Sequence, residues 1–260
     1  MKRWFVFIIG LLLIGYIWGN PFSEGFSNVQ AKVVGTAAKE ADFISIERLK
    51  RLFFFEEAVK EAYQMQVPKG KQVVEKNIPL TLKQAIVATE DKRFYDHHGI
   101  DVFGVARAFY INTVAGETME GGSTISQQLV KNLFLSDERV FSRKVEEAVM
   151  ALLLERYFTK DEILTMYLNS IYFGNNYTGL YEASRGYFKT DPSRLTLAES
   201  ALLAGLPQAP SYYNPVENPK GARERRATVL SLLQEQGFIS KEEERRANAE
   251  SLLGLYEKER

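Results

Sequence analysis

The first twenty-two residues constrain this chain most strongly. A run without any charged residue extends from Trp4 to Phe22, directly after Lys2 and Arg3. In a helix, these nineteen residues would span roughly 28 Å, close to the ~30 Å hydrocarbon thickness of a bilayer. We therefore expect residues 1–22 to form an uncleaved transmembrane signal anchor.

The flanks of this run predict its orientation. Trp4 and Trp18 stand near its two ends, where aromatic residues favour the membrane interface, and Lys2 and Arg3 favour a cytoplasmic N-terminus. The rest of the chain would then be extracytoplasmic. A cleaved signal peptide shares the charged start and apolar middle, although bulky Ile17 and Trp18 occupy the zone where small residues mark a cleavage site. A buried core helix is the third alternative.

Charge and cysteine content exclude several functions. Thirty-three basic residues balance thirty-three acidic ones, so the net charge gives no indication of nucleic-acid binding. The absence of cysteine excludes a disulfide scaffold, cysteine catalysis and thiolate metal sites.

The remaining pattern is helical. We interpret residues 23–65 as a connector with a membrane-proximal amphipathic helix at 45–64, and residues 66–260 as one mainly α domain. The run Phe53-Phe54-Phe55 fits either the membrane surface or a core contact. Expected helix caps are Thr81, Thr124 (with Gln127 in a capping box), Ser136 and Thr159. Further helices are expected at 82–91, 101–114, 126–134, 137–157, 160–173, 177–187, 196–206, 221–236 and 240–257.

Glu90 is the first candidate catalytic residue. It follows Leu82 and Ile86 at helical spacing, so an apolar stripe ends in a carboxylate. Partial burial would raise its pKa and suit a general acid or base. A solvated helix-end acid paired with Lys92 or Arg93 is the alternative.

The stretch EGGSTISQQLVKN at 120–132 is small and polar. The Gly121-Gly122 pair allows close approach of a ligand, and the helix start after Ser123 and Thr124 favours anions through its free N–H groups. Gln127 and Lys131 share one face, which suits phosphate oxygens and sugar hydroxyls. An ordinary capped surface helix is the alternative.

A positive stripe is expected in SDERVFSRKVEEAVM. In a helix from Asp137, the side chains of Arg139, Arg143 and Glu147 lie on one face, and two arginines can hold a diphosphate. A surface ladder of ion pairs would show the same spacing.

Together these stretches resemble the peptidoglycan glycosyltransferases of glycosyltransferase family 51, which also form the N-terminal module of class A penicillin-binding proteins. The motif E-D-x-x-F-x-x-H-x-G is matched by Glu90, Asp91, Phe94, His97 and Gly99. The second motif is matched by Gly121, Ser123, Thr124, Ser126, Gln127, Gln128, Lys131 and Asn132. The third is matched by Arg143, Lys144 and Glu147, and the fourth by Lys160, Ile163, Leu164, Tyr167, Leu168 and Asn169.

The resemblance covers about residues 66–236, including the segments AESALLAGLPQAPSYYNP and RRATVL. It departs from the family pattern at Ser126, where threonine is usual and a hydroxyl is retained. It implies a lysozyme-like helical domain beside a smaller, mobile, membrane-associated jaw, in which the aromatic segment 100–116 would lie near lipid rather than in the core. The implied substrates are lipid II and the growing glycan chain, with the protein in the bacterial cell membrane. A cell-wall synthesis complex is an implied partner and moenomycin an implied inhibitor.

The resemblance also implies roles for individual residues. Glu90 would be the general base, and Glu147 the second essential glutamate, which holds the donor diphosphate or a divalent ion (Mg²⁺ or Mn²⁺). No cofactor is otherwise required. Substrate-binding residues would be Ser123, Thr124, Gln127, Gln128, Lys131, Arg139, Arg143 and Lys144. Supporting residues would be Asp91, Phe94, His97, Gly99, Gly122, Asn132 and Asn169.

Two other functions fit parts of the pattern. A lytic transglycosylase or muramidase uses a catalytic glutamate on a neutral glycan but has no use for the basic set. A membrane-tethered scaffold would bind lipid-linked precursor without turnover, although Glu90 and Glu147 are retained. No S-x-x-K sequence occurs, so penicillin-reactive transpeptidase chemistry is not expected in this sequence. The adjacent His97 and His98 raise a metal site as an alternative to a structural hydrogen bond.

Overall fold

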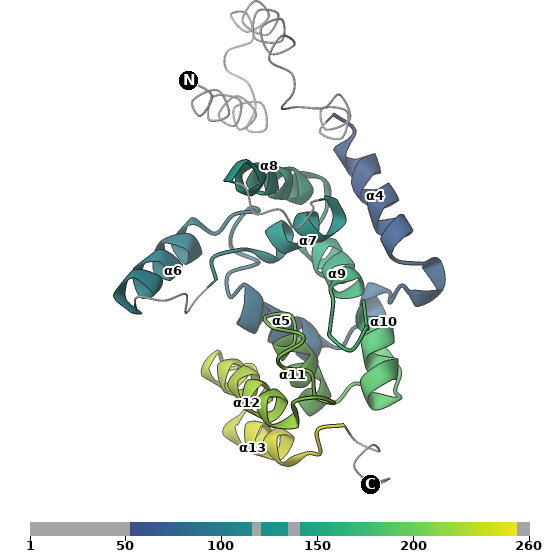
Figure 1. Ribbon diagram of the computed structural model, residues 1–260, viewed down its shortest axis with the longest axis vertical. Coiled ribbons are helices and arrows are strands. Elements are labelled where there is room, and N and C mark those ends of the chain that lie inside the picture. The colour runs from purple at the N-terminus through teal and green to yellow at the C-terminus, as the bar shows by residue number, and fades with distance from the viewer. Residues whose placement is uncertain (1–52, 116–120, 135–140, 254–260) are drawn as a thin grey trace, which may run out of the picture.

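The computed structural model describes residues 53–115, 121–134 and 141–253, and every structural statement below concerns these residues. Figure 1 shows a mainly helical molecule, and the described residues contain two isolated β-bridges but no strand. The α-helices are α4 (Phe55–Gln66), α5 (Leu80–Glu90), α6 (Val102–Ala115), α7 (Ile125–Phe134), α8 (Phe141–Tyr157), α9 (Lys160–Ser170), α10 (Leu180–Ala183), α11 (Leu197–Gly205), α12 (Pro219–Glu235) and α13 (Lys241–Ala249). Shorter turns are η1 (Lys69–Lys71), η2 (Glu75–Asn77), the π-helical η3 (Ser184–Phe188) and η4 (Pro192–Arg194). The predicted mainly α fold is confirmed.

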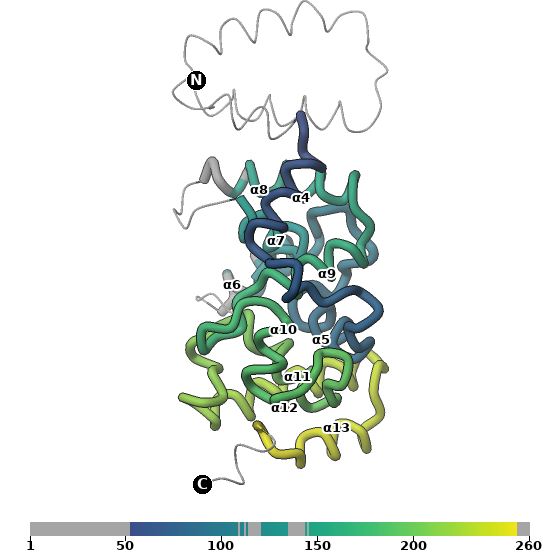
Figure 2. Tube along the Cα trace, turned by 90° about the vertical axis from the view of Figure 1, so that its right-hand side faces the viewer, coloured from purple at the N-terminus to yellow at the C-terminus, as the bar shows by residue number. Residues whose placement is uncertain are grey.

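The helices form two packed groups that share one core. Helix α7 packs against α8 and α9, and α4 contacts all three; α5 packs against α11 and α12, and α12 against α13. In Figures 1 and 2 the α8 end and the α13 end of the described molecule lie far apart, with α5 between them. The last residue of α5, Glu90, therefore lies close to the junction of the two groups.

Most predicted helix starts agree with the structure. Thr159 accepts a hydrogen bond from the Glu162 N–H while the Glu162 carboxylate accepts one from the Thr159 N–H, so the capping box that starts α9 is complete. The predicted cap at Thr81 is wrong, because α5 begins at Leu80, two residues earlier than predicted and directly after Pro79, whose fixed φ of −59° suits a helix start. The Thr81 hydroxyl instead lies 3.3 Å from the Ser200 hydroxyl on α11.

Two helices end earlier than the sequence pattern predicts. Helix α9 stops at Ser170 rather than near 173, because the chain becomes extended at Ile171 and turns back in a bridge between Tyr172 and Thr178. Helix α13 stops at Ala249 rather than at 257. There the buried Arg226 guanidinium donates to the carbonyls of Asn248, Glu250 and Ser251, which stabilises the helix end.

The first residues of the described chain divide between core and surface. Phe55 and Val59 of α4 are buried, whereas Phe53 and Phe54 are 80% and 65% exposed. The transmembrane prediction for 1–22, most of the connector and the Ser136 cap lie outside the described residues. Among the helices that are described, none combines the length and the apolar character that a membrane span needs.

Helix α6 lies to one side of the packed groups (Figure 1). Asp101 directly precedes this helix; its carboxylate accepts from the Gly104 N–H and forms an ion pair with Arg93. Its apolar side chains Val102, Phe103 and Tyr110 are about 70% exposed. The segment 100–116 is therefore not a simple core helix.

Candidate active site

Glu90 ends an apolar stripe, as its spacing predicts. Leu82 and Ile86 are fully buried, two turns and one turn earlier respectively, and Glu90 itself is partly buried at the C-terminus of α5. Burial raises the pKa of the Glu90 carboxyl above its usual range; a hydrogen bond from Gln128 and the charge of Arg225 act in the opposite direction. The Gln128 Nε2 donates to Glu90 Oε2 at 2.9 Å. The alternative pairing of Glu90 with Arg93 is not what the structure shows, because Arg93 pairs with Asp101.

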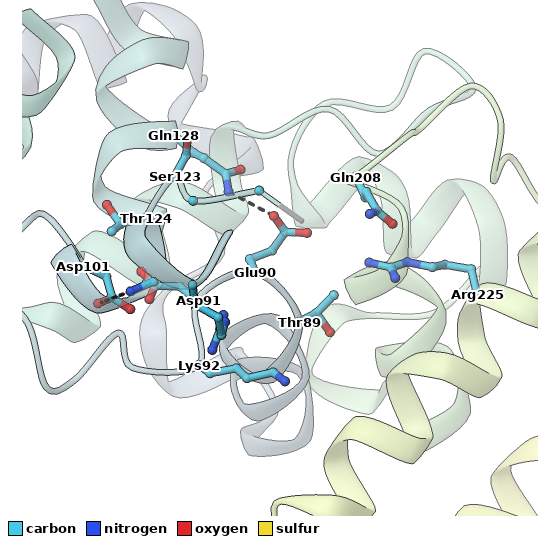
Figure 3. A pocket seen from close by; sticks show the side chains of 14 residues that line it. Thr89, Glu90, Asp91, Lys92, Asp101, Ser123, Thr124, Gln128, Gln208 and Arg225 are labelled. Atoms are coloured by element: carbon cyan, nitrogen blue, oxygen red, sulfur yellow. Dashed lines mark hydrogen bonds between the residues drawn. The ribbon is translucent and has the colours of Figure 1, made fainter. Parts of the chain in front are cut away.

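A polar pocket lies in front of this carboxylate. Its lining residues come from the end of α5, the first half of α6, the segment 121–124, α7, and the α11–α12 region. They are Thr89, Glu90, Asp91, Lys92, Asp101, Gly104, Arg107, Gly121, Gly122, Ser123, Thr124, Gln128, Gln208 and Arg225. In Figure 3 the Glu90 side chain lies between Gln128 on one side and Gln208 with Arg225 on the other.

Some residues of the stretch 121–128 form the cap of α7, and others line the pocket. The Thr124 N–H donates to Gln127 Oε1 and the Gln127 N–H donates to the Thr124 hydroxyl, so the predicted capping box is confirmed. Thr124 also donates to the Gly99 carbonyl at 2.7 Å. Gln127 is consequently buried within the cap, whereas Gln128 reaches the pocket.

The start of α7 differs from the expected row of free donors. The Ile125 N–H donates to Asp91 Oδ2 at 3.0 Å, and the N–H groups of Thr124 and Gln127 are used in the cap. These three N–H groups are therefore not free for a substrate anion, because a protein carboxylate and the cap already use them. Gly121 lines the pocket, and a Cβ added there would have no atom within 4 Å; a Cβ added at Gly122 would lie 3.2 Å from the Cα of Val105 on α6.

Asp91 connects the two helix groups. Besides the Ile125 N–H, it accepts a hydrogen bond from His97 Nε2 at 3.0 Å. His97 Nδ1 lies 3.9 Å from Glu155, which forms an ion pair with Lys160 at 2.7 Å. This buried network holds the first motif against α7 and α8.

The remaining residues of the first motif support this network. The Lys160 ammonium lies 4.4 Å above the ring of buried Phe94. Gly99 has a φ of +79°, and a Cβ there would lie 2.7 Å from the Ala151 backbone. His98 is exposed while His97 is buried, and the described residues contain no cluster of three or more histidine or acidic side chains that could hold a metal. The paired-histidine metal site has no support here.

Glu147 is buried beside one of its predicted neighbours. Lys144 donates to the Ser123 hydroxyl at 2.9 Å and pairs with Glu147, which is 2% exposed. This contact links α8 to the edge of the pocket. The described residues place Glu147 in no group of three or more histidine or acidic side chains that could hold a metal, and we derive no step through a metal.

The other predicted site residues lie as follows. Lys131 is partly buried and Asn132 exposed on α7. Asn169 is buried and pairs with both backbone groups of Val73, which fixes the segment before α5. Arg139 lies outside the described residues, and so does the side chain of Arg143.

Sequence reasoning did not single out Gln208 and Arg225 as site residues. Both lie in segments that were noted as family-like, but nothing in their spacing relates them to Glu90. Arg225 comes near Glu90 because α12 packs against α5. Its guanidinium is fixed there by donating to the Gly205 carbonyl at 3.2 Å. Its guanidinium also lies 5.6 Å from the centre of the Tyr213 ring.

The mainly helical domain thus places a partly buried carboxylate between an amide and a guanidinium in a polar pocket, an arrangement that suits the active site of an enzyme using acid–base chemistry. Residues 57–234 match the family model described as transglycosylase, which covers more than half of the chain. The chain belongs to this family, and the resemblance inferred from its motifs is confirmed.

Two curated relatives agree with this family. The chain is 47% identical over 181 residues to penicillin-binding protein 1F of Bacillus subtilis, covering 70% of this chain and 25% of that protein. It is 48% identical over 176 residues to penicillin-binding protein 1A of Neisseria flavescens, covering 68% and 22%. The crystal structure of penicillin-binding protein 1A from Haemophilus influenzae matches 69% of this chain and 17% of its own, with 27% identity and a TM-score of 0.42. The chain thus spans about a quarter of the length of the curated relatives.

Proposed function

We propose that this chain is a peptidoglycan glycosyltransferase that polymerises lipid II into glycan strands. Membership of the transglycosylase family supports the reaction class. The observation that carries the assignment is Glu90, a carboxylate with a raised pKa that faces a pocket with basic side chains. Such a carboxylate is suited to accept a proton from an attacking hydroxyl, while the basic side chains face the anionic group that leaves.

In this reaction Glu90 removes the proton from the 4-hydroxyl of the acceptor N-acetylglucosamine. The freed oxygen forms a bond to the anomeric carbon of the donor N-acetylmuramic acid, and the bond from that carbon to the undecaprenyl diphosphate breaks. Attack from the face opposite the leaving group inverts the anomeric configuration. The proton ends on Glu90 and the electron pair on the diphosphate.

Basic side chains would stabilise the departing diphosphate. Of the basic residues that the resemblance implies, Lys131 and Lys144 lie among the described residues, and Lys144 reaches Ser123 at the pocket edge. Arg139 and Arg143 complete the proposed set. Glu147 would act through Lys144, which it contacts from a buried position, rather than through direct proton transfer.

We further propose that the enzyme works at a bacterial membrane, with residues 1–22 as the anchor and the catalytic domain outside the cytoplasm. The exposed apolar residues of α6 and, separately, the exposed Phe53 and Phe54 beside α4 support contact with lipid, because large apolar side chains left exposed are suited to a membrane surface. A lipid-linked substrate would then reach the pocket from the bilayer. Moenomycin sensitivity and a cell-wall synthesis complex are part of the same proposal.

A product assay tests this function. Purified full-length protein is incubated with fluorescent lipid II, with and without moenomycin, and a second sample receives preformed glycan strands. We expect polymer that disappears with moenomycin and intact glycan strands in the second sample. Fragmented strands would indicate a lytic enzyme, and unchanged lipid II would indicate a binding protein; either result contradicts the proposal.

A further inference from the structure

A buried tyrosine lies behind the Glu90–Gln128 pair. Tyr167 of α9 is fully buried, and its hydroxyl donates to Gln128 Oε1 at 2.9 Å. The other end of the same amide, Gln128 Nε2, donates to Glu90 Oε2 at 2.9 Å (Figure 3). Tyr167, Gln128 and Glu90 thus form one directed chain from three different helices, α9, α7 and α5.

The direction of this chain is fixed by chemistry. An ionised carboxylate only accepts hydrogen bonds, so the amide must present its NH₂ end to Glu90 and its oxygen to Tyr167. A phenol can satisfy that oxygen only while it keeps its proton. Burial, followed by the charges of Glu90 and Asp91, raises the pKa of Tyr167 well above its usual 10, so it remains a donor at any working pH.

We propose that Tyr167 is a positioning residue for Glu90: its hydroxyl fixes the Gln128 amide, which in turn holds the carboxylate in its ionised, pocket-facing orientation. Tyr167 itself does not line the pocket. Its importance for the reaction rests on the proposed function, whereas its effect on the Glu90 carboxyl does not.

The effect on Glu90 has a defined sign. Four groups bear on this carboxyl: Gln128 from α7, Arg225 from α12, the adjacent Asp91, and Tyr167 behind the amide. Gln128 and Arg225 favour the ionised form, whereas burial and Asp91 favour the protonated form. Loosening the amide removes one of the two favourable contacts, so the carboxyl should take up its proton at a higher pH.

The chain offers a matched control. Tyr187 is also buried and donates one hydrogen bond, at 3.0 Å, to the Phe173 carbonyl. Like Tyr167, Tyr187 does not line the pocket. Tyr167→Phe and Tyr187→Phe each remove one buried hydroxyl from one acceptor. Gln128→Leu interrupts the same chain in the middle and leaves the packing of Tyr167 in place, which covers the case in which Tyr167→Phe does not fold.

The experiment is an NMR titration of full-length protein labelled with ¹³C at the glutamate side-chain carboxyls, with the Glu90 resonance identified by its loss in Glu90→Gln. We expect the Glu90 midpoint to move to higher pH in Tyr167→Phe, further in Gln128→Leu, and not in Tyr187→Phe. A midpoint that stays at the wild-type value in Tyr167→Phe, or in Gln128→Leu if Tyr167→Phe does not fold, would overturn the proposal.

Polymerisation of lipid II by the same variants separates this proposal from the proposed function. In Tyr167→Phe the acidic limb of the rate profile should move with the NMR midpoint, and kcat should fall roughly fivefold, since a neutral hydrogen bond contributes about 1 kcal/mol, while KM stays the same. A shifted midpoint in a protein that makes no polymer would support the positioning role and contradict the function. Normal polymerisation with an unshifted midpoint would do the reverse.

Discussion

The Asp91 carboxylate accepts a 3.0 Å hydrogen bond from the N–H of Ile125, the first residue of α7. Its neighbour Glu90 points into the pocket from the end of α5 (Figure 3). Two adjacent acids therefore have separate tasks. Asp91 fixes the helix that carries Gln128, and Gln128 contacts Glu90. The position of the Glu90 carboxylate relative to the Gln128 amide therefore depends on the hydrogen bond between Asp91 and Ile125.

Replacing Asp91 with alanine should destabilise the protein. The buried His97 ring nitrogen and the Ile125 N–H would both lose their acceptor, and an unpaired buried donor costs about 1–3 kcal/mol. We expect the free energy of unfolding in urea to fall by roughly 2–4 kcal/mol. Asp91→Asn retains one acceptor oxygen and should lose less; equal losses in the two variants would contradict this account.

Gly99→Ala tests the packing of the first motif. The residue has a φ of +79°, and its Cβ would lie 2.7 Å from the backbone of Ala151. Overpacking and backbone strain together should cost about 2–4 kcal/mol of stability. Gly70→Ala is the control, because no atom lies within 4 Å of a Cβ at that position. Similar melting temperatures for both variants would show that Gly99 is not sterically required.

Arg225→Met tests the electrostatics of the pocket. The guanidinium charge lowers the pKa of Glu90 against the effect of burial, so its loss should raise that pKa further. Because a general base acts only when ionised, the acidic limb of kcat/KM should move to higher pH. Lys220→Met, at the exposed start of α12, removes the same charge without facing the pocket. An acidic limb that is identical in Arg225→Met, Lys220→Met and wild type would exclude a role for Arg225.

Lys131→Ala tests the proposed diphosphate site. If this ammonium stabilises the leaving group, kcat for lipid II polymerisation should fall by about 10²-fold or more, as for the loss of one preorganised donor. The melting temperature should change little, since the side chain is only partly buried. Lys241→Ala on α13 serves as the control for loss of one surface charge. A variant with a lowered melting temperature and full activity would contradict the diphosphate role.

Local patterns predicted much of this molecule. The caps at Thr124 and Thr159, the buried stripe of Leu82 and Ile86, and the mainly helical fold follow from short-range spacing and hydrogen bonding, which the sequence contains directly. The place of Glu90 at the end of this stripe follows for the same reason. The resemblance to the family motifs further predicted that Glu90 and residues 121–128 belong to one site.

The failures concern contacts between distant segments. Nothing near Ser170 or Ala249 marks the helix ends, because a return bridge and the guanidinium of Arg226 determine them. At the start of α7 the Ile125 N–H donates to Asp91, thirty-four positions earlier, and the local sequence does not indicate this contact. Arg225 faces Glu90 only because α12 crosses α5. Helical periodicity relates residues within one helix and cannot predict contacts between helices that are distant in the sequence.

Glu90→Gln is the most direct measurement of the central claim. The substitution keeps the shape and removes the proton acceptor, so lipid II polymerisation should fall by about 10²- to 10⁴-fold, the usual contribution of a general base. Folding should be retained. Since burial raises the pKa of Glu90 in the folded state, ionisation costs stability as pH rises through that pKa, and the variant should gain melting temperature over wild type toward neutral pH but not below about pH 4. A folded Glu90→Gln protein that polymerises lipid II at a rate near that of the wild type would contradict the account.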